Sequence, residues 1–176
     1  MAKVRDIVQF PTASVLRKKA TEVCAKDSSE EVKRIVEELK ATCLAYDHCV
    51  GLAANQIAYT KRVIVVRPDT EKQAVLVLIN PVAEPLSDAV LESDVEGCMS
   101  IKELQASVKR FNKIKVNYLD ESLTPQELVI NDDPFFARVI LHEIDHLDGR
   151  LFIDRLSPIQ KLRANKLLKK ILKGSS

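Results

Sequence analysis

Two histidines and a glutamate stand at a spacing suited to metal chemistry: His142, Glu143 and His146, in the run LHEIDHLDG. On a helix, residues i and i+4 share a face, so both imidazoles can bind one metal ion. Glu143 flanks the same ion and can take a proton from a metal-bound water. The pattern predicts metal-assisted hydrolysis. The alternative is a helix that carries these polar residues on its solvent-exposed face.

The flanking residues predict that this motif lies on a buried helix. Asn131, Asp132 and Asp133 supply a capping carboxylate, Pro134 stands where the first helical residue belongs, and Gly149 is placed to end the helix. Most of the remaining positions are apolar, namely Phe135, Phe136, Val139, Ile140, Ile144 and Leu147. Imidazoles and a carboxylate inside such a helix need compensation, which a metal provides. The metal site is therefore favoured over the exposed polar face.

The rest of the chain predicts an α+β fold. Ser28 to Glu31 form a capping box before an amphipathic helix that runs to about Tyr46. We also expect a short helix over 14–19, strands over 62–67, 74–80, 82–92, 106–111, 113–118 and 127–130, and a final helix over 157–173. This order predicts mostly antiparallel sheets around the central motif helix, in a single domain of residues 1–176.

Composition restricts the class of protein. With 176 residues, 46% hydrophobic and 30% charged, the chain is typical of a globular protein. No apolar run reaches the length of a membrane span and the N-terminus lacks signal-peptide features, so we expect a cytoplasmic protein, or an organellar one after removal of a transit peptide. Four cysteines without a C-x-x-C pair leave at least one thiol free for other chemistry.

The C-terminal segment is basic although the net charge is only +2. From Ser157 onward there is no acidic residue, and the basic residues are Lys161, Arg163, Lys166, Lys169, Lys170 and Lys173. This helix is either a solvated face or an electrostatic handle for nucleic acid or an anionic assembly.

A catalytic metal site usually has a third protein ligand. The pattern H-E-x-x-H-x-x-G-x-x-H fails here because its last position is Phe152, and the nearest downstream carboxylate is Asp154. Cys98, directly after Gly97, offers a thiolate suited to zinc or Fe(II), the alternative being a plain buried thiol. The small, apolar run from Val50 to Gln56 ends in an amide. This segment could contribute to the site, or it could equally be a tight helix-to-strand connection.

Taken together and in order, GLAANQ, EGCMS and HEIDHLDG resemble the three motifs of the peptide deformylase family, and DIVQFPTASVLRKKA resembles its N-terminal segment. The resemblance implies a metal-dependent hydrolase that removes the formyl group from the N-terminal formyl-methionine of new polypeptides. It implies an α+β fold and one divalent ion, Fe(II) in the cell, with zinc, nickel or cobalt possible in preparations.

The resemblance also implies residue roles. Cys98, His142 and His146 would bind the metal, and Glu143 would be the general base while metal-bound water attacks the formyl carbon. Negative charge on the carbonyl oxygen would be stabilised by the Gln56 side-chain amide and the Met99 backbone N–H. Substrate binding is expected from the backbone at Val50 and Gly51, from the cysteine loop at Glu96 and Gly97, and from Val139 and Leu141 in the methionine pocket. Glu96 is further expected to form an ion pair with Arg110.

Several positions depart from the family pattern, in which Cys49 is usually glycine, Leu141 glutamine, Met99 leucine, Lys102 proline and Gln105 arginine. They leave substrate preference and rate open. The rival interpretations are a metallohydrolase for another N-acyl group and a low-activity formyl-peptide-binding paralogue docked through the basic helix. By resemblance that helix could contact the ribosome, and no specific DNA binding is expected.

Overall fold

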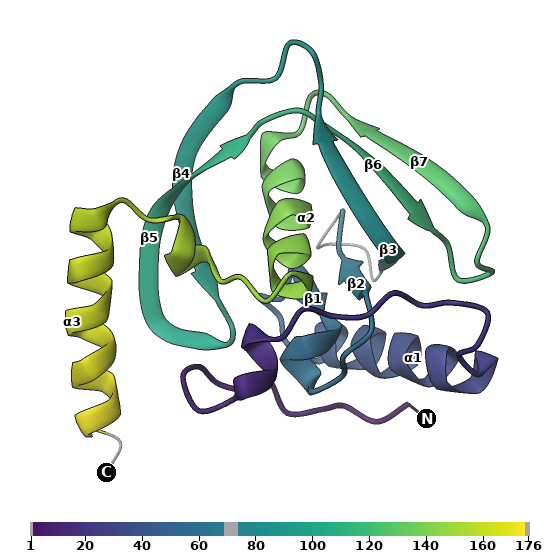
Figure 1. The fold of residues 1–176 in the computed structure, drawn as a ribbon, viewed down its shortest axis with the longest axis horizontal. Coiled ribbons are helices and arrows are strands. Elements are labelled where there is room, and N and C mark those ends of the chain that lie inside the picture. The colour runs from purple at the N-terminus through teal and green to yellow at the C-terminus, as the bar shows by residue number, and fades with distance from the viewer. Residues whose placement is uncertain (1, 69–73, 175–176) are drawn as a thin grey trace.

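The computed structural model describes residues 2–68 and 74–174, and Figure 1 shows its elements. Its three α-helices are α1 (Ser29–Ala45), α2 (Pro134–Leu147) and α3 (Pro158–Gly174). Three short 3-10 helices are η1 (Ser14–Arg17), η2 (Ala54–Ile57) and η3 (Phe152–Arg155). The strands are β1 (Gly51–Ala53), β2 (Val63–Val66), β3 (Leu76–Pro85), β4 (Leu91–Cys98), β5 (Ile101–Phe111), β6 (Ile114–Leu119) and β7 (Pro125–Ile130).

The strands form two antiparallel sheets, so the predicted fold class is confirmed. One sheet has five strands in the order β1-β2-β3-β6-β7, and the other is the two-stranded ribbon β4-β5. Figure 1 shows α2 in the middle, with the ribbon on one side and the larger sheet on the other. α2 contacts β1 and β2 of the larger sheet and β5 of the ribbon. Both sheets therefore enclose the motif helix.

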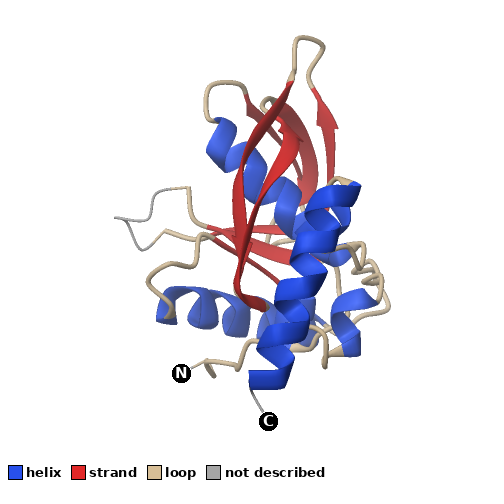
Figure 2. Ribbon diagram, turned by 90° about the vertical axis from the view of Figure 1, so that its left-hand side faces the viewer, coloured by secondary structure: helices blue, strands red, loops and turns tan. Residues whose placement is uncertain are grey.

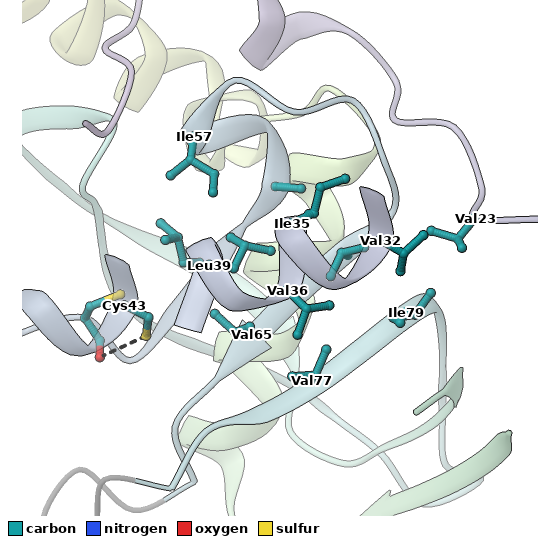
Figure 3. Close-up of a cluster of buried hydrophobic side chains, with 14 residues drawn as sticks. Val23, Val32, Ile35, Val36, Leu39, Cys43, Ile57, Val65, Val77 and Ile79 are labelled. Atoms are coloured by element: carbon teal, nitrogen blue, oxygen red, sulfur yellow. Dashed lines mark hydrogen bonds between the residues drawn. The ribbon is translucent and has the colours of Figure 1, made fainter. Parts of the chain in front are cut away.

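The larger sheet is covered on both faces at β2. Alternate residues of a strand point to opposite faces, and in β2 Val63 and Val65 pack with α1 whereas Ile64 and Val66 pack with α2. Figure 3 shows the first of these clusters, in which the apolar side of α1 meets the sheet. All four β2 residues are buried, which explains the continuous apolar run in the sequence.

The C-terminal helix packs on the outside of the ribbon. Ala164 and Leu168 of α3 join a third core cluster with Leu104 and Val108 of β5, and Figure 2 shows α3 lying along the ribbon. Three other apolar side chains of α3 are exposed, with Ile159 at 67%, Leu162 at 73% and Leu167 at 38%. Within the described residues, no helix combines the length and apolar character needed to cross a membrane.

The helix start signals are borne out, but the predicted strand over 82–92 is wrong. The Ser28 hydroxyl accepts from the Glu31 N–H at 3.0 Å and Asp133 caps α2 in the same way at 2.9 Å. β3 continues to Pro85 through a register shift between Ile79 and Val82, and β4 begins only at Leu91. The chain turns between them, so the apolar residues of this region belong to two strands in different sheets. The expected helix over 14–19 is the single 3-10 turn η1.

Candidate metal centre and active site

Helix α2 places His142 and His146 side by side. The two residues are one turn apart, and their ring centroids lie 5.0 Å apart. Both side chains are largely buried, with His146 only 1% exposed. The carbonyl of His146 accepts a hydrogen bond from the Asn55 side-chain amide, which ties the end of α2 to η2. The helix is therefore fixed at the level of its two imidazoles.

Cys98, at the end of β4, approaches the histidines from the ribbon. Its Sγ lies 3.2 Å from His146 Nε2, and the ligand atoms of Cys98, His142 and His146 all lie within 4.8 Å of one another. One thiolate and two imidazoles suit zinc or ferrous iron, and three protein ligands leave a position open for water or substrate. The Oε2 atom of neighbouring Glu143 is buried without a hydrogen-bond partner among the described residues. The donor set and this unpaired oxygen together fit a catalytic metal ion.

Glu143 is held at the centre of the site by close packing. It is 4% exposed, and burial raises the pKa of its carboxyl to about 7. Gly51 of β1 lies directly against it, since a Cβ at position 51 would stand 2.8 Å from Glu143 Oε1 and 2.8 Å from Val139 Cγ1. Only glycine leaves room here, so the sequence of β1 sets where the carboxylate lies.

Gln56 is oriented by hydrogen bonds at both ends of its amide. Its Oε1 accepts from the Ala53 N–H at 2.8 Å. Its Nε2 donates to Ser100 Oγ at 3.3 Å and lies 3.8 Å from Cys98 Sγ. The donor end of the side chain is thereby directed at Cys98, one of the three candidate metal ligands. The Met99 N–H, on the same loop as Cys98, has no hydrogen-bond partner among the described residues.

Glu96 orients His142 from behind. Its Oε2 lies 2.9 Å from His142 Nδ1, so the Nε2 atom of that ring is left for the metal. The ion pair expected with Arg110 is present, with Nε to Oε1 at 2.7 Å and Nη2 to Oε2 at 2.9 Å. Burial works to raise the pKa of Glu96, but the hydrogen bonds from Arg110 and His142 outweigh it and hold that pKa well below its usual range.

Further partners of this network were not predicted from the sequence. Arg138 Nη1 donates to Glu96 Oε1 at 2.8 Å, and Arg110 Nη1 donates to Asp145 Oδ2 at 2.5 Å. Arg155 adds a second pairing to Asp145 through Nη2 at 2.6 Å. Burial works to raise the pKa of Asp145, but the hydrogen bonds and charges of the two arginines lower it. Asp145 lies between the two histidines in the sequence, and this position was the signal from which its place in the network could have been predicted.

The pKa values of the two imidazoles are shifted in opposite directions because their surroundings differ. Burial acts to lower the pKa of His142, but interactions with the Cys98 thiol and the Glu96 carboxylate outweigh it and raise the pKa to about 10. Burial and the nearby charge of His142 lower the pKa of His146, whose Nδ1 has no hydrogen-bond partner among the described residues. Only His142 has a carboxylate behind it.

A cavity of about 660 Å³ opens onto these groups, a size typical of ligand sites. The expected site residues that line it are Val50, Gly51, Gln56, Glu96, Gly97, Cys98, Met99, Val139, His142 and Glu143. His146, which is 1% exposed, is not among the described lining residues. The expectation for Leu141 is not met: it is not among the described lining residues and packs against the second core cluster. Residues two apart on a helix point about 200° apart, so Val139 and Leu141 cannot share one pocket.

Cys49 also lines the cavity but does not obstruct it. It is 1% exposed, and its thiol donates to the Gly51 carbonyl at 3.2 Å. The neighbouring Cys43 thiol and burial hold the pKa of Cys49 well above its usual range, so this thiol stays protonated. The departures Lys102 and Gln105 line the same cavity.

A buried carboxylate beside three side chains that could bind a metal ion, at an open cavity, is an arrangement with which hydrolases activate water. The class of protein that the fold and this site define is a metal-dependent hydrolase. Comparison of the sequence with known protein families then identifies the family. Residues 4–162 match the family model described as polypeptide deformylase, and the chain belongs to that family, whose members are hydrolases that remove the formyl group from an N-terminal methionine.

Individual relatives agree over nearly the full length. Peptide deformylase 2 of Vibrio cholerae is 36% identical over 164 residues, covering 93% of this chain and 92% of its own. The peptide deformylase of Desulfotalea psychrophila is 39% identical over 160 residues, covering 89% and 90%.

Solved structures agree as well. The Legionella pneumophila peptide deformylase matches with a TM-score of 0.84 and 31% identity, covering 98% of both chains. The Acinetobacter baumannii enzyme bound to Met-Ala-Ser matches with a TM-score of 0.75 and 32% identity, covering 89% of this chain and all of its own.

Proposed function

We propose that this chain removes the N-formyl group from the N-terminal formyl-methionine of newly made polypeptides, with Glu143 as general base. Cys98, His142 and His146 would hold the metal. The observation that carries the proposal is the buried, unpaired Oε2 of Glu143, which lies on the cavity and one residue from the first histidine. A buried acceptor of this kind needs a proton donor from the reacting groups.

A bound divalent ion would polarise the formyl carbonyl and make water acidic enough to react near neutral pH. Glu143, with a pKa raised to about 7, can accept the proton of the attacking water and then pass it to the leaving amine. The Gln56 amide and the Met99 N–H donate to the carbonyl oxygen as negative charge grows on it. Both donors are fixed before the substrate arrives, which is the condition for strong electrostatic stabilisation.

Strand β1 supports binding of an extended peptide. It is an edge strand paired only with β2 among the described residues, so no described strand pairs with its other side. A peptide can add to such an edge through main-chain hydrogen bonds. We propose that Val50 and Gly51 provide this edge, that Glu96 and Gly97 line the opposite wall, and that Val139 contacts the methionine side chain. A relative's complex with Met-Ala-Ser supports this choice of ligand.

We further propose Fe(II) as the ion in the cell, with zinc, nickel or cobalt as possible replacements. The proposed place of action is the cytoplasm, where new chains carry their formyl group, or an organelle with its own translation. The basic helix α3 packs through Ala164 and Leu168, and it exposes basic residues that are available for contact with the ribosome, namely Lys161, Arg163, Lys166, Lys169 and Lys170. Ribosome association that does not weaken with rising salt would contradict this electrostatic contact.

The decisive experiment compares the parent with Glu143→Gln, purified without oxygen, in metal content and in hydrolysis of formyl-Met-Ala-Ser. We expect the variant to keep its metal and lose roughly a hundredfold or more in kcat. Glu103→Gln is the matched control, because Glu103 lines the same cavity and is exposed. Acetyl-Met-Ala-Ser serves as the competing substrate. Full activity of Glu143→Gln, or equal hydrolysis of the acetyl peptide, would contradict the proposal.

A further inference from the structure

The cavity wall contributed by α2 includes an arginine. Phe135, Arg138, Val139 and His142 all line the cavity. Their spacing of i, i+3, i+4 and i+7 places them on one face of the helix. Arg138 stands one turn before the metal ligand His142, beside the residue proposed to contact the methionine side chain. A purely apolar pocket would not place a guanidinium there.

The contacts of Arg138 leave part of its guanidinium unused. It is only 6% exposed. Nη1 donates to Glu96 Oε1 at 2.8 Å and to the Val108 carbonyl at 2.8 Å, and Nη2 donates to the Glu92 carbonyl at 2.9 Å. A guanidinium has five N–H groups. Two of them, on Nε and Nη2, have no partner among the described residues.

Neutralising Glu96 does not by itself require Arg138. The Glu96 carboxylate already accepts two hydrogen bonds from Arg110 and faces His142 Nδ1. Arg138 is therefore a second cation on a carboxylate that is already paired. Its distinguishing feature is that it lies on the cavity, whereas Arg110 is not among the described lining residues.

We propose that Arg138 is a specificity-determining residue that gives the pocket for the substrate's first side chain a polar end. This inference rests on the proposed deformylation. The spare N–H groups would donate weakly to a thioether sulfur and strongly to the oxygen of a sulfoxide. A hydrocarbon side chain of the same length would cover these donors without pairing them. The pocket would thus accept formyl-methionine sulfoxide, the oxidised form of the usual first residue, in preference to formyl-norleucine.

The test measures kcat/KM for three formyl tripeptides that differ only in the first residue: methionine sulfoxide, methionine and norleucine, each followed by Ala-Ser. For the parent we expect the sulfoxide peptide to exceed the norleucine peptide by roughly tenfold or more, the usual effect of a hydrogen bond to a charged group. Arg138→Met should lose this preference, and Arg138→Lys should keep part of it. Each ratio compares kcat/KM for two peptides on the same variant, so a change in metal content affects both values equally and does not alter the ratio.

Arg155→Met is the matched control, because Arg155 belongs to the same charge network but does not line the cavity. Its sulfoxide-to-norleucine ratio should equal that of the parent. If the parent turns over formyl-Met-Ala-Ser but favours norleucine over the sulfoxide, the inference is overturned. It is also overturned if the ratio is unchanged in Arg138→Lys and Arg138→Met. A parent inactive on all three peptides would instead overturn the proposed deformylation.

Discussion

Replacing Gly51 with alanine should impair catalysis by moving the general base. The new Cβ would stand 2.8 Å from Glu143 Oε1 and 2.8 Å from Val139 Cγ1, whereas ordinary contacts begin at 3.4 Å, so each neighbour is about 0.6 Å too close. Val139 is β-branched and on a helix, where its side chain has essentially one rotamer. The Glu143 carboxylate must therefore give way, although it is 4% exposed and closely packed.

The size of the effect follows from that displacement. A misplacement of about 1 Å at a reacting group can reduce rate by on the order of a hundredfold. A shift of roughly half that size should lower kcat by on the order of tenfold, and the overpacking should lower the free energy of unfolding by about 1–3 kcal/mol. Metal content should stay at the parent level, because the three nearest atoms to the new methyl group belong to Glu143 and Val139 and not to the three proposed ligands.

Gly97→Ala provides the control for kcat and stability, since the nearest atom to its added Cβ lies at 3.5 Å, and an effect of the added methyl group on the cavity wall should change KM alone. The assay is steady-state hydrolysis of formyl-Met-Ala-Ser, with urea unfolding and metal analysis on the same preparations. Adding Val139→Ala to Gly51→Ala should restore part of the lost stability, because it removes one of the two close contacts. Gly51→Ala with parental kcat would show that Glu143 is not held against β1, and the assignment of its place in the site would fail.

Two further predictions concern the groups around the metal ligands. Arg110→Met should lower the free energy of unfolding in urea by about 3–5 kcal/mol, because Glu96 and Asp145 would keep buried charges with one partner fewer. Arg155→Met should cost far less, since the Arg155 side chain is 38% exposed, and equal losses would contradict a buried network. Gln56→Glu should lower kcat on the order of a hundredfold by removing the amide donor, while stability is largely kept because an oxygen still accepts from Ala53. Unchanged kcat would remove Gln56 from the oxyanion site.

The part of the site on α2 could be predicted from the sequence because its signals are local. Asp133, Pro134 and Gly149 define the ends of the helix, and the spacing of His142 and His146 places both on one face. None of these inferences needs contacts from another part of the chain. The same holds for α1, whose Ser28 cap and apolar spacing lie within one segment.

The positions of Cys98 and Gln56 could not be derived from spacing. Cys98 reaches His146 only because β4 and β5 form a ribbon beside α2, and Gln56 reaches Cys98 because η2 is tied to the end of that helix. The roles of Cys98 and Gln56 were predicted from the resemblance to the peptide deformylase family, because local patterns do not indicate them. β4 itself was mispredicted because its residues are mostly exposed on both faces, so it shows no alternation of apolar and polar residues.

The H-E-x-x-H motif has two interpretations, a metal site on a buried helix or a polar face exposed to solvent. The charged residues of α2 show why periodicity alone could not decide between them. An amphipathic helix keeps its charges toward solvent, yet Arg138, Glu143 and Asp145 are between 3% and 6% exposed. They are buried because α2 is enclosed by two sheets. Each buried charge on α2 then needs a partner of opposite charge from another element. Glu96 and Arg110 come from the ribbon and Arg155 from η3. Glu143 has an oxygen that no described residue pairs. The other carboxylate of the helix, Asp145, is paired with two arginines, so the unpaired oxygen of Glu143 supports the proposal that the reaction takes place there.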